Sequence, residues 1–300
     1  NRPGPLAEAR IVVVPRGAVG SVAERLHEAG VIGDTRPFRA WAWLTRRDGA
    51  LRAAEFSFPA HASLRQVLSI LRSAPPVQHF VTIPEGLTAH QIGTILAQAD
   101  TATGKVGPIA EGSVLPDTYA YEYGTPRTAI LARAQAAMTR ALDEAWAGRS
   151  EGLGLSSPRQ VLILASIVER ETAKPEERPH IAAVYLNRLR LGMRLQADPT
   201  VVYGVSGGTG LLDRGLTRQD LASNDPFNTY RNAGLPPGPI CSPGLASIRA
   251  VTHPAESDDL YFVADGSGGH AFARTMEAHE RNVARWKALI APSGSSGSQD

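Results

Sequence analysis

The most suggestive chemical group in the sequence is a glutamate at the end of an apolar helix. Residues 161–168 are almost uniformly apolar, and Glu169 follows them directly, one helical turn beyond Ala165. A carboxyl group in that place is expected to be partly desolvated, which disfavours its charged form and suits a general acid. An ordinary ion pair with Arg170 or Arg188 explains the same residue equally well.

Periodicity does not single out this glutamate. Glu171 also stacks on apolar positions of the same helix, among them Leu164 and Val168. The helical pattern alone therefore leaves two candidates, Glu169 and Glu171.

Polar side chains gather in two further segments. The stretch from Asn187 to Tyr203 combines amide, guanidinium, carboxylate and phenol groups of the kind that hold sugars, although a solvated loop is the simpler interpretation. Asn228 and Tyr230 precede a run of stiff Pro-Gly turns that could rigidify a cleft wall or form a plain structural loop.

Several kinds of site are disfavoured. The histidines lack metal-ligand spacing, no nucleotide-binding glycine motif is present, and the basic residues are spread rather than clustered as nucleic-acid binding requires. Cys241 is the only cysteine and has no histidine partner fixed by sequence, so we expect a passive small side chain. We therefore expect no metal, no cofactor and no nucleic-acid partner.

The elements that position these residues fall into two parts. In the first hundred residues, three β-rich runs each end in proline and turn into a helix-period segment, at Pro15, Pro59 and Pro84. A further helix is expected over 37–47. The small, glycine-containing residues 100–110 predict a domain boundary there.

The second part is predicted to be a mixed α+β domain that follows an α/β first part. We predict helices over 125–147, from the N-cap Ser157 to about 173, over 179–191 and over 276–289, with a hairpin around 265–269 and a long irregular stretch at 204–243. The fold class is therefore α+β. The predicted domains are 1–103, 104–291 and a flexible tail over 292–300.

Composition is that of an ordinary globular chain. Of 300 residues, 43% are hydrophobic and 20% charged, with a formal net charge of +2, so a sizeable core is feasible. The longest apolar run, 161–168, is much shorter than the ~20 residues of a membrane helix. Because the chain starts at Asn1 without a leader, we expect a truncated or processed form whose targeting segment has been removed.

Several motifs resemble one family in its own order along nearly the whole chain. The motifs are VTIPEGLT (81–88), EGSVLPDTY (111–119), ILASIVERET (163–172), VYLNRLRLGMRLQADPTVVYG (184–204), NTYRNAGLPPGPICSPG (228–244) and LYFVADGSGGHAF (260–272). They resemble the endolytic murein transglycosylases, the MltG or YceG-like family.

The resemblance implies a catalytic role for Glu169, the first glutamate of the family's ASIVE motif, and so separates it from Glu171. It implies a LysM-like N-terminal region and cleavage of the β-1,4 bond between N-acetylmuramic acid and N-acetylglucosamine within nascent strands, leaving 1,6-anhydro ends and terminating strand elongation. With the polar segments, it leads us to expect a substrate-binding set of Asn187, Arg188, Gln196, Asp198, Thr200, Tyr203, Asn228 and Tyr230.

The same resemblance implies partners and a location. The substrate would be peptidoglycan glycan strands, with peptidoglycan synthases as possible protein partners. Family members are bound to the inner membrane by a single N-terminal helix, so this region is expected in the periplasm.

Three other functions compete with this one. A hydrolase would need a second carboxylate near Glu169, for which Asp198, Glu171 and Asp117 are the candidates. A binding module without activity is compatible with a LysM-like half. A pyridoxal-dependent lyase needs a sheltered lysine, whereas the three lysines, Lys105, Lys174 and Lys287, all look exposed.

Overall fold

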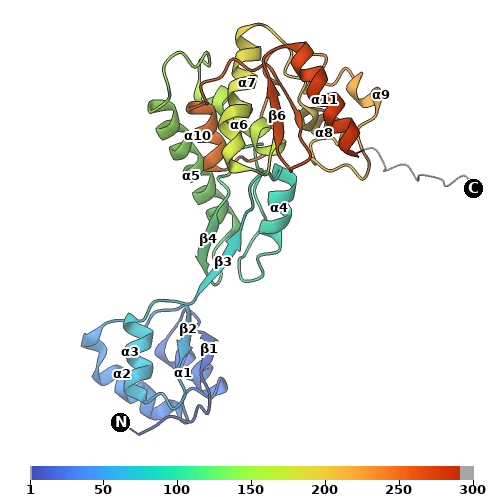
Figure 1. The fold of residues 1–300 in the computed structure, drawn as a ribbon. Coiled ribbons are helices and arrows are strands. Elements are labelled where there is room, and N and C mark those ends of the chain that lie inside the picture. The colour runs from blue at the N-terminus through green and yellow to red at the C-terminus, as the bar shows by residue number, and fades with distance from the viewer. Residues whose placement is uncertain (1, 291–300) are drawn as a thin grey trace, which may run out of the picture. The chain divides into compact units, whose positions relative to one another are not determined.

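The computed structural model of the protein describes residues 2–290 and has the predicted α+β architecture (Figure 1). Its contacts divide the chain into two units. The first comprises the described residues up to Val81, with 99–105 and 118–130; the second comprises 82–98, 106–117 and the described residues from 131 onward. The units thus alternate along the chain, whereas the sequence predicts one boundary near residue 103. The predicted tail, 292–300, lies outside the described residues.

The first unit contains the strand-turn-helix pattern that the sequence predicts. Strand β1 pairs antiparallel with β2, and helices α1, α2 and α3 supply the apolar faces of one core. The periodic positions that follow Pro15 and Pro59 are all buried in that core: Val22, Leu26, Val67 and Leu71. The element bounds are β1 Arg10–Val13, α1 Val19–Glu28, α2 Thr35–Leu44, a 3-10 turn η1 Arg46–Asp48, β2 Glu55–Phe58 and α3 Leu64–Ser73.

Local capping explains where these helices begin. Ser63 and Gln66 form a reciprocal capping box at the start of α3, and Thr88 with Gln91 forms another at α4. Both boxes follow a proline that ends a strand, which is the turn the sequence predicts. Helix α4 spans Ala89–Ala97 and follows strand β3, Gln78–Thr82. Strand β3 pairs with β4, Thr118–Glu122.

The second unit is built around helix α6, Pro158–Glu171, which packs on α7, Arg178–Arg190, and α10, Leu245–Thr252. Five residues of the run 161–168 lie in the main core cluster: Val161, Leu164, Ala165, Ile167 and Val168. Every residue of the run is buried except the half-buried Leu162. The predicted buried helix is therefore confirmed. Its start is also as predicted, since Ser157 accepts a hydrogen bond from Gln160 N and Pro158 occupies the first turn.

The remaining elements surround these three helices. The predicted hairpin is confirmed: β5 and β6 pair antiparallel around the loop 265–269. Three short helices, α8, α9 and α10, were not predicted. The chain from Asn187 to Tyr203 reads as a polar segment, 204–243 reads as irregular, and the sequence predicts no element over 245–252. The bounds are α5 Arg127–Ala147, η2 Pro175–Glu177, α8 Asp198–Val205, α9 Arg218–Leu221, β5 Tyr261–Ala264, β6 His270–Ala273 and α11 Met276–Ile290.

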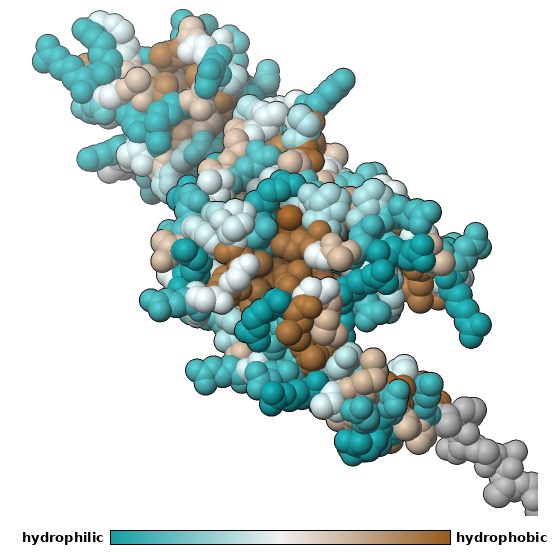
Figure 2. All heavy atoms as spheres, turned by 90° about the horizontal axis from the view of Figure 1, so that it is seen from above, coloured by the Kyte–Doolittle hydropathy of each residue, from teal (hydrophilic) through white to brown (hydrophobic). Residues whose placement is uncertain are grey.

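The surface is mixed rather than apolar. On the face shown in Figure 2, hydrophilic side chains cover most of the area and apolar side chains gather near the middle. Within residues 2–290, no helix has both the length and the apolar character to cross a bilayer.

Candidate active site

Glu169 lies in the last turn of α6, and its carboxylate is enclosed by protein groups. Only 4% of its side chain is exposed. Oε1 accepts a hydrogen bond from Arg178 Nη2 at 2.9 Å, and Oε2 accepts one from the backbone N–H of Gly244 at 2.8 Å. Both donors suit an ionised carboxylate, because a carboxylic acid would direct its own O–H against one of them. A proton on Glu169 therefore requires one donor to move.

For Glu169 the sequence predicts either a desolvated acid or an ion pair, and the structure shows both features together. The glutamate is buried and paired, but its partner is Arg178 at the start of α7. Arg170 instead donates to Gly86 O, and Arg188 donates to three other backbone carbonyls. Neither Arg170 nor Arg188 is therefore the ion-pair partner of Glu169. The partner, Arg178, comes from the neighbouring helix α7.

Arg178 also faces a second carboxylate. Its Nη2 lies 3.6 Å from Glu85 Oε2, so one nitrogen contacts two carboxyl groups. Glu85 follows β3 in sequence and its side chain is 47% exposed, against 8% for Arg178. Sequence reasoning considered Asp198, Glu171 and Asp117 as second carboxylates and missed Glu85; its only signal was its place in the PEGLT motif.

Two glycines let backbone segments approach these carboxyl groups. Gly86 has a φ of +76°, a left-handed conformation that other residues rarely adopt, and it lies in contact with the Glu169 side chain. At Gly244 a Cβ would overlap the Glu85 carboxylate. The two segments are joined by backbone hydrogen bonds from Gly86 N to Ser242 O and from Ser242 N to Leu87 O. The donor at Gly244 is thereby held in place against Glu169.

Glu171 occupies a separate polar cluster. It accepts a hydrogen bond from the Tyr185 hydroxyl, and burial raises its pKa to about 7, with Asp198 adding to the rise and the Tyr185 hydrogen bond opposing it. Nearby, the Tyr230 hydroxyl donates to Asp198 Oδ1 at 2.6 Å. The surroundings of Glu171 thus favour the protonated form of its carboxyl group.

A half-buried carboxyl group, that of Glu111, lies beside the start of α4. Glu111 accepts hydrogen bonds from Ala89 N at 2.9 Å and from the Tyr203 hydroxyl at 3.2 Å. Burial raises the pKa of Glu111 above its ordinary value and raises that of Tyr203 to about 12. Tyr203 is therefore a neutral donor that links α8 to this segment.

Four of the eight predicted substrate-binding residues are buried, and their side chains make hydrogen bonds inside the protein. Asn187 donates to Ser257 O and Asp259 O, and Arg188 donates to Leu260 O and Leu195 O. Both therefore tie α7 to the chain before β5.

The other two buried members lie near the start of α8. Thr200 bonds to Thr229, and the amide of Asn228 donates to carbonyls of the α9 region. These four side chains shape the unit from within.

The remaining members are more accessible. Gln196 and Asp198 are exposed, and Tyr230 and Tyr203 are half-buried. Gln196 has a φ of +52°, a left-handed conformation that is uncommon outside glycine, and its N–H donates to Thr229 O. The structure thus brings Asp198 and Tyr230 together at an accessible edge, with Gln196 two residues away in sequence.

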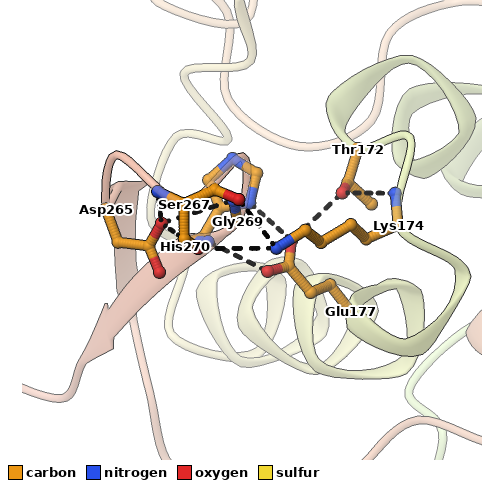
Figure 3. A network of polar contacts seen from close by, with 7 residues as sticks. All are labelled: Thr172, Lys174, Glu177, Asp265, Ser267, Gly269 and His270. Carbon is orange, nitrogen blue, oxygen red and sulfur yellow. Dashed lines mark hydrogen bonds and ion pairs between the residues drawn. The ribbon is translucent and has the colours of Figure 1, made fainter.

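A polar network fixes the segment that carries Arg178 (Figure 3). Glu177 accepts hydrogen bonds from Thr172 Oγ1 and from both the backbone N–H and ring Nδ1 of His270. Lys174 reaches Ser267 across the hairpin loop. The end of α6, the start of α7 and strand β6 are therefore joined within a few residues of Glu169 and Arg178.

No metal arrangement is found in this part of the chain. Among residues 2–290, no group of three or more His, Cys, Asp or Glu side chains could hold a metal ion. Cys241 is buried, and its thiol donates to Ser166 O at 3.3 Å. Its pKa is raised well above the ordinary value by burial.

Comparison with known proteins gives consistent matches. The chain is 35% identical over 173 residues to an endolytic murein transglycosylase of Bacillus subtilis, covering 57% of this chain and 46% of that protein. It is 29% identical to one of Streptococcus pneumoniae, covering 91% of this chain and 57% of that protein. The chain thus spans about half the length of these curated relatives.

A solved structure agrees with them. The crystal structure of a putative YceG-like protein from Listeria monocytogenes matches with a TM-score of 0.54 and 27% identity, covering 92% of this chain and 99% of that one. The model of the YceG-like family matches residues 12–285. With nearly the whole described chain matched by the family model, the protein belongs to the YceG-like family.

Proposed function

We propose that the chain is the catalytic part of an endolytic lytic transglycosylase that cuts peptidoglycan glycan strands. The observation that carries the proposal is Glu169, a carboxylate buried at the end of α6 and held by Arg178 and the Gly244 N–H, in a chain of the YceG-like family. The bond cut is the β-1,4 linkage between N-acetylmuramic acid and N-acetylglucosamine. Cutting inside nascent strands would end their elongation.

One carboxyl group can perform both halves of this reaction. Protonated Glu169 donates its proton to the glycosidic oxygen while the bond from that oxygen to C1 of the muramoyl residue breaks, and an oxocarbenium-like centre develops. The resulting carboxylate removes the proton from the C6 hydroxyl of the same sugar as O6 bonds to C1. The products are a 1,6-anhydromuramoyl end and a free 4-hydroxyl, and Glu169 regains its proton.

The surrounding residues suggest how the sugar is held. Asp198, Tyr230 and Gln196 form the accessible edge that we assign to substrate contact. The four buried members of the set hold α7, α8 and the loop between them in place: Asn187, Arg188, Thr200 and Asn228. Tyr203 helps to hold α8 in place through its hydrogen bond to Glu111. The same proposal includes a LysM-like N-terminal region over 1–103, an N-terminal membrane anchor, a periplasmic location and peptidoglycan synthases as partners.

A hydrolase is the second candidate, and Glu85 is the observation that favours it. Retaining glycosidases place two carboxyl groups about 5 Å apart, and inverting ones about 6.5 to 9.5 Å apart. Glu85 and Glu169 contact the same nitrogen of Arg178, so a second carboxylate is available near the proposed acid. In that mechanism water would complete the reaction, and the product would carry a reducing end.

The test is mass spectrometry of the products from uncrosslinked glycan strands. Wild-type protein should yield internal fragments with 1,6-anhydro ends, and Glu169→Gln should yield none. Glu176→Gln is the matched control, because Glu176 is an exposed glutamate seven residues further along the chain. Reducing ends would favour the hydrolase, and intact strands with the wild type would favour a binding module.

A further inference from the structure

Arg178 is shared by two carboxylates and is incompletely bonded. Its Nη2 lies 2.9 Å from Glu169 Oε1 and 3.6 Å from Glu85 Oε2. Its Nε is buried and has no hydrogen-bond partner. An arginine locked onto one carboxylate normally uses two of its nitrogens, so this guanidinium is not fixed on Glu169 alone.

The proposed chemistry requires that this pairing change. Both oxygens of Glu169 accept hydrogen bonds, and the Gly244 donor is backbone held by the neighbouring segment. The Arg178 side chain is the donor that can turn. Protonation of Glu169 at Oε1 therefore needs an alternative acceptor for Arg178 close by.

Glu85 is that acceptor in the structure. Its carboxylate fills the space left by the missing Cβ of Gly244, directly beside the Glu169 donor. Its side chain is 47% exposed, whereas those of Glu169 and Arg178 are 4% and 8% exposed. Of the three charged groups, Glu85 is the one that a ligand can reach.

We propose that Glu85 is a positioning residue that draws Arg178 away from Glu169, so that Glu169 can carry the proton it gives to the glycosidic oxygen. This inference rests on the proposed transglycosylase function. Two carboxylates share the single guanidinium of Arg178, and like charges close together favour protonation of one of them. The guanidinium of Arg170, which donates to Gly86 O, opposes this effect. Other titratable groups near Glu169 are Arg170 on α6 and the buried thiol of Cys241, which itself also interacts with Glu111.

The experiment compares the pH dependence of kcat/KM for wild type, Glu85→Gln and the control Glu176→Gln on uncrosslinked strands. Without the Glu85 charge, Arg178 stays on Glu169, and the acid keeps its proton only at lower pH. The alkaline limb of the Glu85→Gln profile should move to lower pH by about one unit, which is about a tenfold loss above that limb. The Glu176→Gln profile should match the wild type, and KM should change less than kcat for Glu85→Gln.

A second variant tests the same geometry from the other side. Gly244→Ala places a Cβ where the Glu85 carboxylate lies and should displace that carboxylate, moving the alkaline limb in the same direction. Thermal unfolding of each variant establishes that it is folded before its profile is compared. A wild-type profile for Glu85→Gln, or a loss confined to KM, would overturn the proposal.

Product analysis in the same reactions separates this inference from the proposed function. If the wild type yields anhydro ends and the pH profile of Glu85→Gln is not shifted, the transglycosylase function stands and the positioning role of Glu85 is refuted. Reducing ends from the wild type would remove the transglycosylase, and total loss of cleavage by Glu85→Gln at every pH would assign Glu85 as the second carboxylate of a hydrolase. Intact strands with wild-type protein would overturn both.

Discussion

Arg178 and Glu169 form a 2.9 Å ion pair that joins the start of α7 to the end of α6, with both side chains nearly inaccessible to solvent. Removing one member of a buried pair leaves an unpaired charge in the interior, which is far more costly than losing an exposed pair. The pair therefore contributes to the stability of the second unit as well as to the proposed chemistry.

We predict that Arg178→Ala lowers the free energy of unfolding by about 3 kcal/mol. In a Glu169→Gln background the same change should cost clearly less, because no buried charge is left unpaired, giving a coupling energy of about 2 kcal/mol. Urea unfolding of the four proteins in the double-mutant cycle measures this. Equal costs in both backgrounds would show that the two side chains do not interact in solution.

Glu171 predicts a pH dependence of stability with a definite sign. Burial raises its pKa from 4.5 to about 7 in the folded state, so between these values the folded state binds more protons than the unfolded state. Stability should fall as pH rises through this window, by at most about 1.4 kcal/mol per pH unit.

The matching variant is Glu171→Gln, which keeps an acceptor for the Tyr185 hydroxyl but cannot ionise. We expect its stability relative to the wild type to increase from pH 5 to pH 8. Urea unfolding across that range, with the exposed Glu176→Gln as control, checks the sign. A difference between variant and wild type that does not change with pH would show that Glu171 titrates normally.

Glu177 predicts the opposite behaviour in acid. Burial tends to raise its pKa, but the hydrogen bonds from His270 and Thr172 outweigh burial and lower it below 4.5. A lowered pKa gives stability that is present above the unfolded pKa and lost as pH falls through the folded pKa. Part of the acid sensitivity of the protein should therefore come from this group (Figure 3).

We expect Glu177→Gln to be less stable than wild type at pH 7, with the gap narrowing toward pH 3. Because Glu177 precedes Arg178, cleavage activity should also fall, while Glu176→Gln should leave both properties unchanged. Unfolding and turnover measured on the same preparations test this. A constant gap across pH would mean that the stabilisation comes from packing rather than from the charge.

The accessible edge predicts an effect on substrate binding. Asp198→Asn weakens the contact to the Tyr230 hydroxyl and removes an exposed charge without disturbing the core. If this edge contacts the glycan, KM should rise by about tenfold, as expected for loss of one to two kcal/mol of binding, with a smaller change in kcat.

Asp213→Asn provides the control for that variant, because Asp213 is another exposed aspartate of the second unit. Steady-state kinetics on strands of defined length give both constants. Unchanged kinetics for Asp198→Asn would remove Asp198 from the substrate-binding set and leave Tyr230→Phe to be tested separately.

Local sequence patterns were sufficient for most of the elements. Pro15, Pro59 and Pro84 mark strand ends, Ser157 caps α6, and the glycine-rich loop 265–269 joins β5 to β6, because turn, cap and period signals act over a few residues. Helices α8, α9 and α10 were missed, because each has eight residues or fewer and so shows too few turns for a clear helical period.

The sequence by itself determined that Glu169 lies near the end of a buried helix, since the apolar run 161–168 directly before it indicates burial on all sides of α6. Only the tertiary structure decided its partners. Arg178 is nine residues away, Gly244 is 75 residues away and Glu85 is 84 residues away, and no local pattern links groups so far apart in the chain. Charge pairing in the interior depends on which helices and loops pack together, and that follows from the whole core rather than from any one segment.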